Sequence, residues 1–232
     1  MLAQNSEGKD IGPQSPRDID SLTGENKVVF PVAPAYTSMN LCNIHFHKSA
    51  EHKGGQFTKY AGNGDGNGYR TGFLYSGNLT EAELAPVVGQ EFCPSENGSL
   101  HPGDTIEAHY VFSSGQVEPG ATLYACLDES TENLLVRVET QIYVLVNDAN
   151  ASDFIELTKH DKVNGLHQAL NIPNNTGTPV QYAGSTTGPQ YNDEASPFQV
   201  TWNVRLRWLR STLPQWADGV KAMHSVKTML TG

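Results

Sequence analysis

The sequence predicts a mainly β protein, a single domain with a central twisted, mostly antiparallel sheet and a few short surface helices. Three observations predict this fold class. Hydrophobic residues make up 38% of the 232 residues and charged residues only 17%, and 22 glycines with 13 prolines favour strands joined by long turns over a helical bundle. Two long stretches alternate apolar and polar side chains with the period of two that a strand requires. All-β chains of this length commonly stay a single domain, so we expect one domain.

The start of the chain differs in composition from the rest. Residues 1–27 carry Gly, Pro, Ser, Asp and Asn without apolar periodicity, which is typical of an extended surface arm. We expect this N-terminal arm to pack on a single β domain, residues 28–232.

The two alternating stretches are the clearest strands. In residues 134–146, apolar side chains line one face and polar side chains such as Arg137 and Glu139 line the other, which is typical of a half-buried strand. Residues 200–208 alternate in the same way. The other segments expected to be strands are residues 28–32, a segment beginning near residue 41, and residues 71–75, 104–112 and 122–127.

Three short helices are expected between the strands. Thr80 can cap one turn in residues 79–84, and Ser152 can cap another in residues 153–157. A last helix is expected from about residue 214 to 223, with a proline in its first turn. The segments expected to be loops are residues 61–68, 91–103 and 171–190.

Charge and hydropathy exclude two classes of partner. The net charge of -10 and the isoelectric point near 5.2 repel phosphate backbones and anionic membranes, so we expect no nucleic-acid partner. No apolar run approaches the roughly 18 residues of a membrane span. The start, Met1–Gln4, resembles a mature chain with an added initiator. We therefore expect a periplasmic or secreted protein without a signal peptide, and the sequence leaves a homodimer open.

Cys42, Cys93 and Cys126 show no CxxC pair and no metal-ligand spacing. A disulfide between Cys42 and Cys93 is one hypothesis, and it would fit an oxidising compartment. Three ordinary buried thiols are an equal alternative.

The richest chemistry lies in residues 43–52, which hold three of the eight histidines. His45 and His47 have the i, i+2 spacing that places both side chains on one face of a strand, where they can share a metal ion. His109, in the expected strand 104–112, is the best candidate for a third ligand. Three imidazoles with an open fourth position form a typical catalytic zinc site.

Polar residues accompany two of these histidines. Asn43 precedes His45 by two residues and Glu107 precedes His109 by two, so each would lie on the same strand face as its histidine. Metal-binding histidines usually donate their other N–H to such an acceptor, which fixes the ring orientation and tautomer. We expect Asn43 and Glu107 to orient His45 and His109.

Other interpretations of the same residues remain. The spacing His45-x-His47-x-x-x-Glu51 also resembles the first metal motif of the cupins, in which Glu51 would be a ligand to iron or manganese in an oxygenase or isomerase. The absence of a glycine before Asn43 and the long gap from Gly103 to His109 argue against it. A non-catalytic metal-binding β protein is a further alternative, and histidine triads also accept cobalt and other metals.

Motifs along the chain resemble α-class carbonic anhydrases in the same order. They are Gln14-Ser15-Pro16-x-x-Ile19, His45-Phe46-His47 followed by Glu51-His52, Glu107-x-His109, Tyr182-x-Gly184-Ser185-Thr186-Thr187 and Val200-Thr201-Trp202-x-Val204. Within the metal strand, Cys42-x-x-His45-x-His47-x-x-x-Glu51-His52 is closer to the δ-class carbonic anhydrases and their bacterial relatives. The chain is thus similar to a δ-class enzyme that shares its plan with the α class.

The resemblance implies a zinc lyase (carbonate dehydratase) with an α-class-like fold. Zinc on His45, His47 and His109 would generate hydroxide that attacks carbon dioxide to give bicarbonate and a proton. The resemblance assigns Thr186 to accept the hydroxide proton and Glu51 to receive the proton of that threonine. Because the loop after Gly184 is one residue shorter than in the α class, Thr187 stays an alternative to Thr186.

Two further parts of such a site can be sought in the sequence. An apolar wall for carbon dioxide would include Val111, Val144 and Trp202, although core packing is the alternative role for each. A proton-shuttling histidine has no match between residues 26 and 40, which leaves the candidates His101, His160 and His167 or plain surface histidines.

Overall fold

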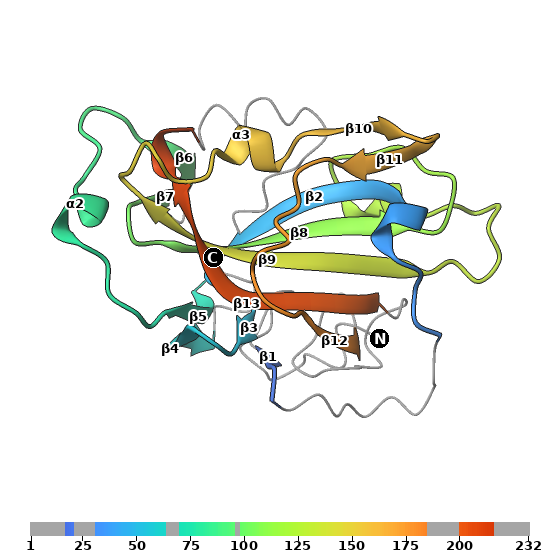
Figure 1. The fold of residues 1–232 in the computed structure, drawn as a ribbon, viewed down its shortest axis with the longest axis horizontal. Coiled ribbons are helices and arrows are strands. Elements are labelled where there is room, and N and C mark those ends of the chain that lie inside the picture. Colours follow the sequence, from blue (N-terminus) through green and yellow to red (C-terminus); the bar gives the residue numbers. More distant parts are fainter. Residues whose placement is uncertain (1–16, 21–30, 64–69, 96–97, 185–199, 216–232) are drawn as a thin grey trace.

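The computed structural model describes residues 17–20, 31–63, 70–95, 98–184 and 200–215. Its centre is a five-stranded sheet with the order β12-β13-β9-β8-β2 (Figure 1). The neighbouring strands are antiparallel except β9 and β13, which run parallel. The predicted mainly β class with a mostly antiparallel central sheet is confirmed. The strands of this sheet are β2 (Asn40–Lys48), β8 (Thr105–Ser113), β9 (Val136–Val146), β12 (Val180–Gly184) and β13 (Val200–Thr212).

Smaller elements surround the sheet. The two-stranded pairs are β1 (Arg17–Asp18) with β3 (His52–Lys53), β4 (Phe57–Asn63) with β5 (Thr71–Tyr75), β6 (Phe92–Ser95) with β7 (Gly98–Leu100), and β10 (His160–Val163) with β11 (Leu166–Ala169). The helical turns are α2 (Glu81–Leu84), α3 (Phe154–Leu157) and the 3-10 turns η1 (Tyr36–Ser38), η2 (Leu123–Cys126) and η3 (Leu213–Gln215). Among the described residues, no helix is long and apolar enough to cross a membrane.

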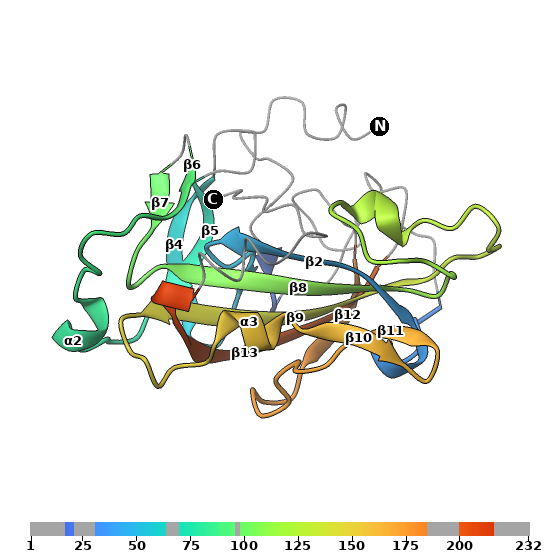
Figure 2. The same ribbon diagram turned by 90° about the horizontal axis from the view of Figure 1, so that it is seen from above.

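Both faces of the sheet are covered (Figure 2). Helix α3 and the β10–β11 hairpin lie on one side, and η2 lies on the other with the β4–β5 hairpin. On the α3 side, Phe46 packs in a core of aromatic and aliphatic side chains with Tyr110 and Phe154. Strand residues alternate between faces, so His45, His47 and His109 point to the opposite side, which we call the histidine face.

The prediction that residues 134–146 form a half-buried strand is wrong, because every residue of β9 is buried. Its polar side chains Arg137, Glu139 and Gln141 lie on the α3 side and are paired there rather than solvated. Arg137 Nε donates to Glu139 Oε1 at 2.7 Å, and Asn203 Nδ2 donates to the same oxygen at 2.9 Å. The alternation therefore marks the strand correctly but not its exposure.

Several segments differ from their predicted type. The expected loop 61–68 begins within β4, which extends to Asn63. Residues 122–127 contain the 3-10 turn η2 instead of a strand, since the chain turns there to bring Cys126 against β2. The expected loops 91–103 and 171–190 contain the short strands β6, β7 and β12. These strands have three to five residues and lie beside Gly and Pro, so their sequence gives only a turn signal.

The predicted helix caps are confirmed in one case and shifted in the other. Thr80 caps α2 in a reciprocal arrangement with Glu83. Asp153, not Ser152, caps α3 by accepting from Ile155 N at 2.8 Å. Ser152 is instead engaged with β13, since its backbone N–H donates to Arg210 O and its carbonyl accepts from Thr212 N.

The ends of the described chain test few predictions. In the expected strand 28–32, residues 31 and 32 are not in a strand, and residues 28–30 lie outside the described part. The expected helix 214–223 begins in η3 and then leaves the described part. Within the expected arm, β1 pairs in parallel with β3, and Ile19 is buried in the apolar cluster that contains Trp202.

The predicted disulfide between Cys42 and Cys93 is wrong, because Cys42 is bonded to Cys126, with 5.0 Å between their Cα atoms. A shift in the β2–β8 register between Leu41 and Asn43 forms a bulge at Cys42, and Cys42 packs on the histidine face. Cys93 remains a thiol and packs against the core on the α3 side.

Candidate metal centre

Antiparallel pairing of β2 with β8 brings the three candidate histidines together. His45 lies directly opposite His109, and His47 lies opposite Glu107 on the same face. The ring centroids of the three histidines are 4.9 to 5.1 Å apart, and each offers a nitrogen within 4.8 Å of the others. The three histidines are therefore close enough to share one metal ion, and their role as its ligands stays a prediction.

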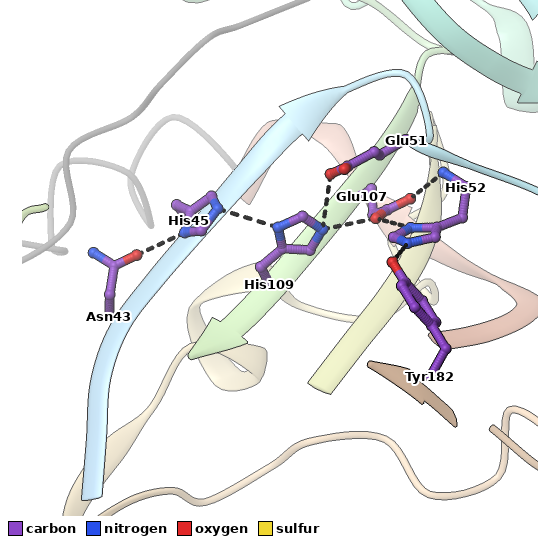
Figure 3. A network of polar contacts seen from close by, with 7 residues as sticks. All are labelled: Asn43, His45, Glu51, His52, Glu107, His109 and Tyr182. Carbon is purple, nitrogen blue, oxygen red and sulfur yellow. Dashed lines mark hydrogen bonds and ion pairs between the residues drawn. The ribbon is translucent and has the colours of Figure 1, made fainter. Parts of the chain in front are cut away.

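Asn43 orients His45 as its spacing predicted. Nδ1 of His45 lies 2.6 Å from Asn43 Oδ1 (Figure 3). The amide nitrogen of Asn43 donates to the Gly120 carbonyl at 2.8 Å, so its oxygen is the end that faces the ring. Because an amide oxygen only accepts, Nδ1 of His45 carries the hydrogen and Nε2 keeps a lone pair.

Glu107 orients His109 in the corresponding way. Nε2 of His109 donates to Glu107 Oε1 at 2.7 Å, which leaves the lone pair on Nδ1. This Nδ1 faces Nε2 of His45 at 3.1 Å. Two nitrogens that both present lone pairs repel each other, unless a cation lies where both can bind it. The donor set of this cluster therefore fits a metal ion.

The pKa values of two candidate ligands, His45 and His47, favour the neutral imidazole, which is the form that binds metal. Burial, together with repulsion from His109 and His47, lowers the pKa of His45 well below its usual range. Burial, together with repulsion from His109, lowers the pKa of His47 to about 3.

Glu107 joins His109 to a second buried histidine. Its Oε1 also accepts from His52 Nδ1 at 2.7 Å, and its Oε2 accepts from the His52 backbone N–H at 3.2 Å (Figure 3). His52 Nε2 in turn lies 2.7 Å from the hydroxyl of Tyr182 on β12. Burial opposes the charged form of Glu107, but attraction to His52 and hydrogen bonds from both histidines hold its pKa well below the usual range.

Sequence reasoning missed the contact between Tyr182 and His52. Tyr182 belongs to a quoted motif, and His52 follows the metal strand, but 130 positions separate the two residues. In the sheet, β13 and β9 separate β12 from β8, and the contact forms because His52, on β3 outside this sheet, lies between Glu107 and Tyr182. The indole of Trp202 adds to this contact, with its centroid 5.2 Å from that of His52 and 5.0 Å from that of His109.

Glu51 lies behind His109 rather than between the candidate ligands. Its carboxylate is buried, and Oε2 is 4.0 Å from Nε2 of His109, the nitrogen that points away from His45. Glu51 forms a second potential ligand group with His52, Glu107 and His109. Thr186 and Thr187 lie outside the described residues, so the expected contact of Glu51 with a threonine stays a prediction.

The candidate wall residues fall into two apolar clusters. Val111 and Trp202 share a cluster, and Val138 lies between them in the register of the sheet. Val144 lies on the same face but packs with Phe57 in another cluster. Val111, Val138 and Trp202 therefore form the apolar surface beside His109, and sequence reasoning did not single out Val138.

The three shuttle candidates lie away from this cluster. The side chain of His101 is 68% exposed and sits near Asp104 before β8. His160 and His167 belong to the β10–β11 hairpin, on the opposite side of the sheet from the histidine face (Figure 2). Their roles as shuttles stay untested predictions.

Comparison with known proteins gives one match. A family model described as Delta carbonic anhydrase matches residues 36–210, roughly three quarters of the chain. This range contains the three histidines and all of the supporting residues described above. Neither a curated protein nor a solved structure matches the chain significantly.

Proposed function

This chain belongs to the delta carbonic anhydrase family, and we propose that it catalyses the reversible hydration of carbon dioxide to bicarbonate and a proton with a zinc ion on His45, His47 and His109. One observation carries the proposal. The unprotonated nitrogens of His45 and His109 face each other at 3.1 Å, with both tautomers set by Asn43 and Glu107.

The donor set supports a catalytic rather than a structural site. Structural zinc sites are closed by four protein ligands, whereas catalytic sites keep one position open. Among the described residues, the possible metal-binding group that contains His45 and His47 has three members, the third being His109, and no fourth protein ligand. When bound, zinc would supply the Lewis acidity that makes water a nucleophile near neutral pH.

The chain would orient the metal ligands, supply a proton acceptor and form an apolar wall beside the metal. Glu107 holds His109 with its lone pair turned towards His45 and His47. Glu51 is the buried carboxylate that would receive the proton passed on by Thr186. The apolar cluster beside His109 would accept carbon dioxide, which is small and has no net dipole, without offering it a strong hydrogen bond.

The cupin alternative is disfavoured by the position of Glu51. A cupin-type site would need the Glu51 carboxylate beside His45 and His47. Glu51 instead groups with His52, Glu107 and His109, on the far side of the His109 ring. A mononuclear iron or manganese site with Glu51 as a ligand would require this side chain to move.

The disulfide supports the proposal of a periplasmic or secreted location, since such bonds persist in oxidising compartments. Alkylation of the protein in its native cells, followed by mass spectrometry, tests this. We expect Cys93 to be alkylated without reductant, and Cys42 and Cys126 only after reduction. Alkylation of all three cysteines without reductant would contradict the location.

The function is tested by measuring zinc content and carbon dioxide hydration on the same samples. We expect one zinc per chain and rapid hydration in the wild type, and loss of both in His47→Ala. His101→Ala is the matched control, because it removes an exposed histidine and should keep the zinc. Thr186→Ala should keep zinc but lose most of the rate. Full hydration by His47→Ala would refute the proposed site.

A further inference from the structure

The Cys42–Cys126 disulfide lies next to the side chain that orients His45. Cys42 directly precedes Asn43 at the bulge of β2, and Cys126 ends η2 in the segment 114–126 that follows β8. Both cysteines are buried. The disulfide therefore joins this segment to the histidine strand three residues before a candidate metal ligand.

Hydrogen bonds tie the same segment to the same point of β2. The Gly120 N–H donates to Cys42 O at 2.9 Å, and Gly120 O accepts from Asn43 Nδ2 at 2.8 Å. A continuous series of contacts thus runs from the disulfide through Gly120 and Asn43 to Nδ1 of His45.

The Gly120 carbonyl decides which end of the Asn43 amide faces His45. A carbonyl only accepts, so it selects the NH2 end and leaves Oδ1 for the ring. If Gly120 moves away, the amide can turn over and donate to Nδ1 of His45. The ring hydrogen then moves to Nε2, the nitrogen that faces His109. That nitrogen would no longer have a lone pair for a metal.

We infer that the Cys42–Cys126 disulfide holds His45 in its metal-binding tautomer, so that the oxidised chain binds zinc more tightly than the reduced chain. This inference rests on the proposed zinc site. A dithiol reductant would supply two electrons and two protons, which break the S–S bond into two thiols while the dithiol becomes a disulfide. Segment 114–126 would then be held at β2 by hydrogen bonds and apolar packing, without a covalent link.

The expected size follows from the role of Asn43. Loss of an orienting partner typically weakens metal binding by about 10- to 100-fold. Reduction should weaken zinc binding by a factor in this range while the sheet stays folded. The site would then reach its full affinity only after the disulfide has formed.

The test compares the zinc dissociation constants of the oxidised and the reduced protein, measured by chelator competition. The reduced protein is prepared with a dithiol, which is then removed under anaerobic conditions. Circular dichroism verifies that both forms are folded. Cys42→Ser/Cys126→Ser should behave like the reduced protein, and it excludes zinc binding by the new thiols. Cys93→Ser is the matched control and should respond to reduction as the wild type does.

Asn43→Asp separates orientation from general stability. A carboxylate accepts from His45 whichever way it turns. The zinc affinity of the Asn43→Asp variant should therefore be equal with and without the disulfide. If reduction weakens Asn43→Asp as much as the wild type, the disulfide acts through stability and the inference fails.

Nitrogen NMR of the metal-free protein gives a readout that does not need zinc. We expect the His45 hydrogen on Nδ1 in the oxidised form and a shift towards Nε2 on reduction. An unchanged tautomer with unchanged zinc affinity would overturn the inference. Absence of zinc binding in the oxidised wild type would instead refute the proposed function itself.

Discussion

His109 and His45 are held in different ways. His109 donates to a carboxylate that also accepts twice from His52, and these groups are buried in the interior of the sheet. His45 donates to a neutral amide on the edge strand β2, and one loop carbonyl, that of Gly120, fixes this amide. Charge-assisted hydrogen bonds are about twice as strong as neutral ones. The His109 support should therefore be the rigid part of the site and the His45 support the adjustable part.

Removing the carboxylate of the rigid part should have the largest effect. Glu107→Ala leaves the buried N–H groups of His109 and His52 without their acceptor, so we expect a loss of roughly 3 kcal/mol in the free energy of unfolding. Zinc affinity should fall by about 100-fold. Urea unfolding and chelator competition measure the two quantities.

Glu139→Ala is the matched control for that variant. Glu139 is also buried and accepts from Arg137 and Asn203, but on the opposite side of the sheet. Its loss should destabilise the fold to a similar extent and leave zinc affinity unchanged. If Glu107→Ala and Glu139→Ala bound zinc with equal affinity, Glu107 would have no specific role in orienting His109.

Acid should destabilise the metal-free protein through the buried ligands. The folded-state pKa values of His45 and His47 lie below the ordinary 6.5, that of His47 at about 3. Below pH 6.5 the unfolded chain therefore binds more protons than the folded chain. Stability should be full above this pH and fall from about pH 6.5 towards about pH 3, by at most about 1.4 kcal/mol per pH unit for each histidine.

Urea unfolding of chelated protein at several pH values measures this slope. His47→Gln should reduce the slope by up to one proton, and His101→Gln, at an exposed site, should leave it unchanged. A slope that is the same in His47→Gln as in the wild type would contradict the burial of a neutral imidazole.

Weakening the adjustable part should have a smaller effect than Glu107→Ala. Asn43→Ala removes the acceptor of His45 but leaves no buried charge unpaired, so we expect about 10-fold weaker zinc binding and a loss of about 1 kcal/mol in stability. Asn40→Ala is the matched control, because Asn40 donates to Gly115 O in the same segment and accepts from the His167 backbone, but does not contact a candidate metal ligand. Equal zinc affinities of the two variants would show that Asn43 does not orient His45.

The smallest effect is expected at the far end of the rigid part. Tyr182→Phe removes the hydroxyl beside His52 Nε2 and should lower the free energy of unfolding by about 1 kcal/mol. Zinc affinity should change by less than about threefold, because Glu107 still holds His109. Tyr110→Phe, which removes a buried hydroxyl bonded to Leu157 O, provides the comparison. If Tyr182→Phe, but not Tyr110→Phe, lost much of its zinc affinity, Tyr182 on β12 would also belong to the support of His109.

The local parts of this site could be predicted from the sequence. Period-two spacing placed His45 beside His47, and the same spacing placed Asn43 and Glu107 next to their histidines. Each of these relations depends only on strand geometry. The capping residue Thr80 was predictable for the same reason, since a cap involves neighbours in the sequence.

Of the parts that depend on distant pairing, the approach of His109 to His45 and His47 was predicted from the chemistry of the residues, but the disulfide and the Tyr182 contact were not. Cys126 reaches Cys42 only because a bulge turns Cys42 to the histidine face and η2 folds back on it. Tyr182 meets His52 only because β3, which lies outside the central sheet, places His52 between the Glu107 carboxylate and β12. The half-buried pattern of residues 134–146 misled because Glu139 finds Arg137 and Asn203 under a covered face, where pairing replaces water.

A zinc titration of the metal-free protein, followed by stopped-flow hydration of carbon dioxide, tests the central claim most directly. We predict that activity rises linearly with added zinc and reaches its plateau at one zinc per chain. A protein that takes up one zinc without hydrating carbon dioxide, or hydrates it without metal, would contradict the three-histidine catalytic site.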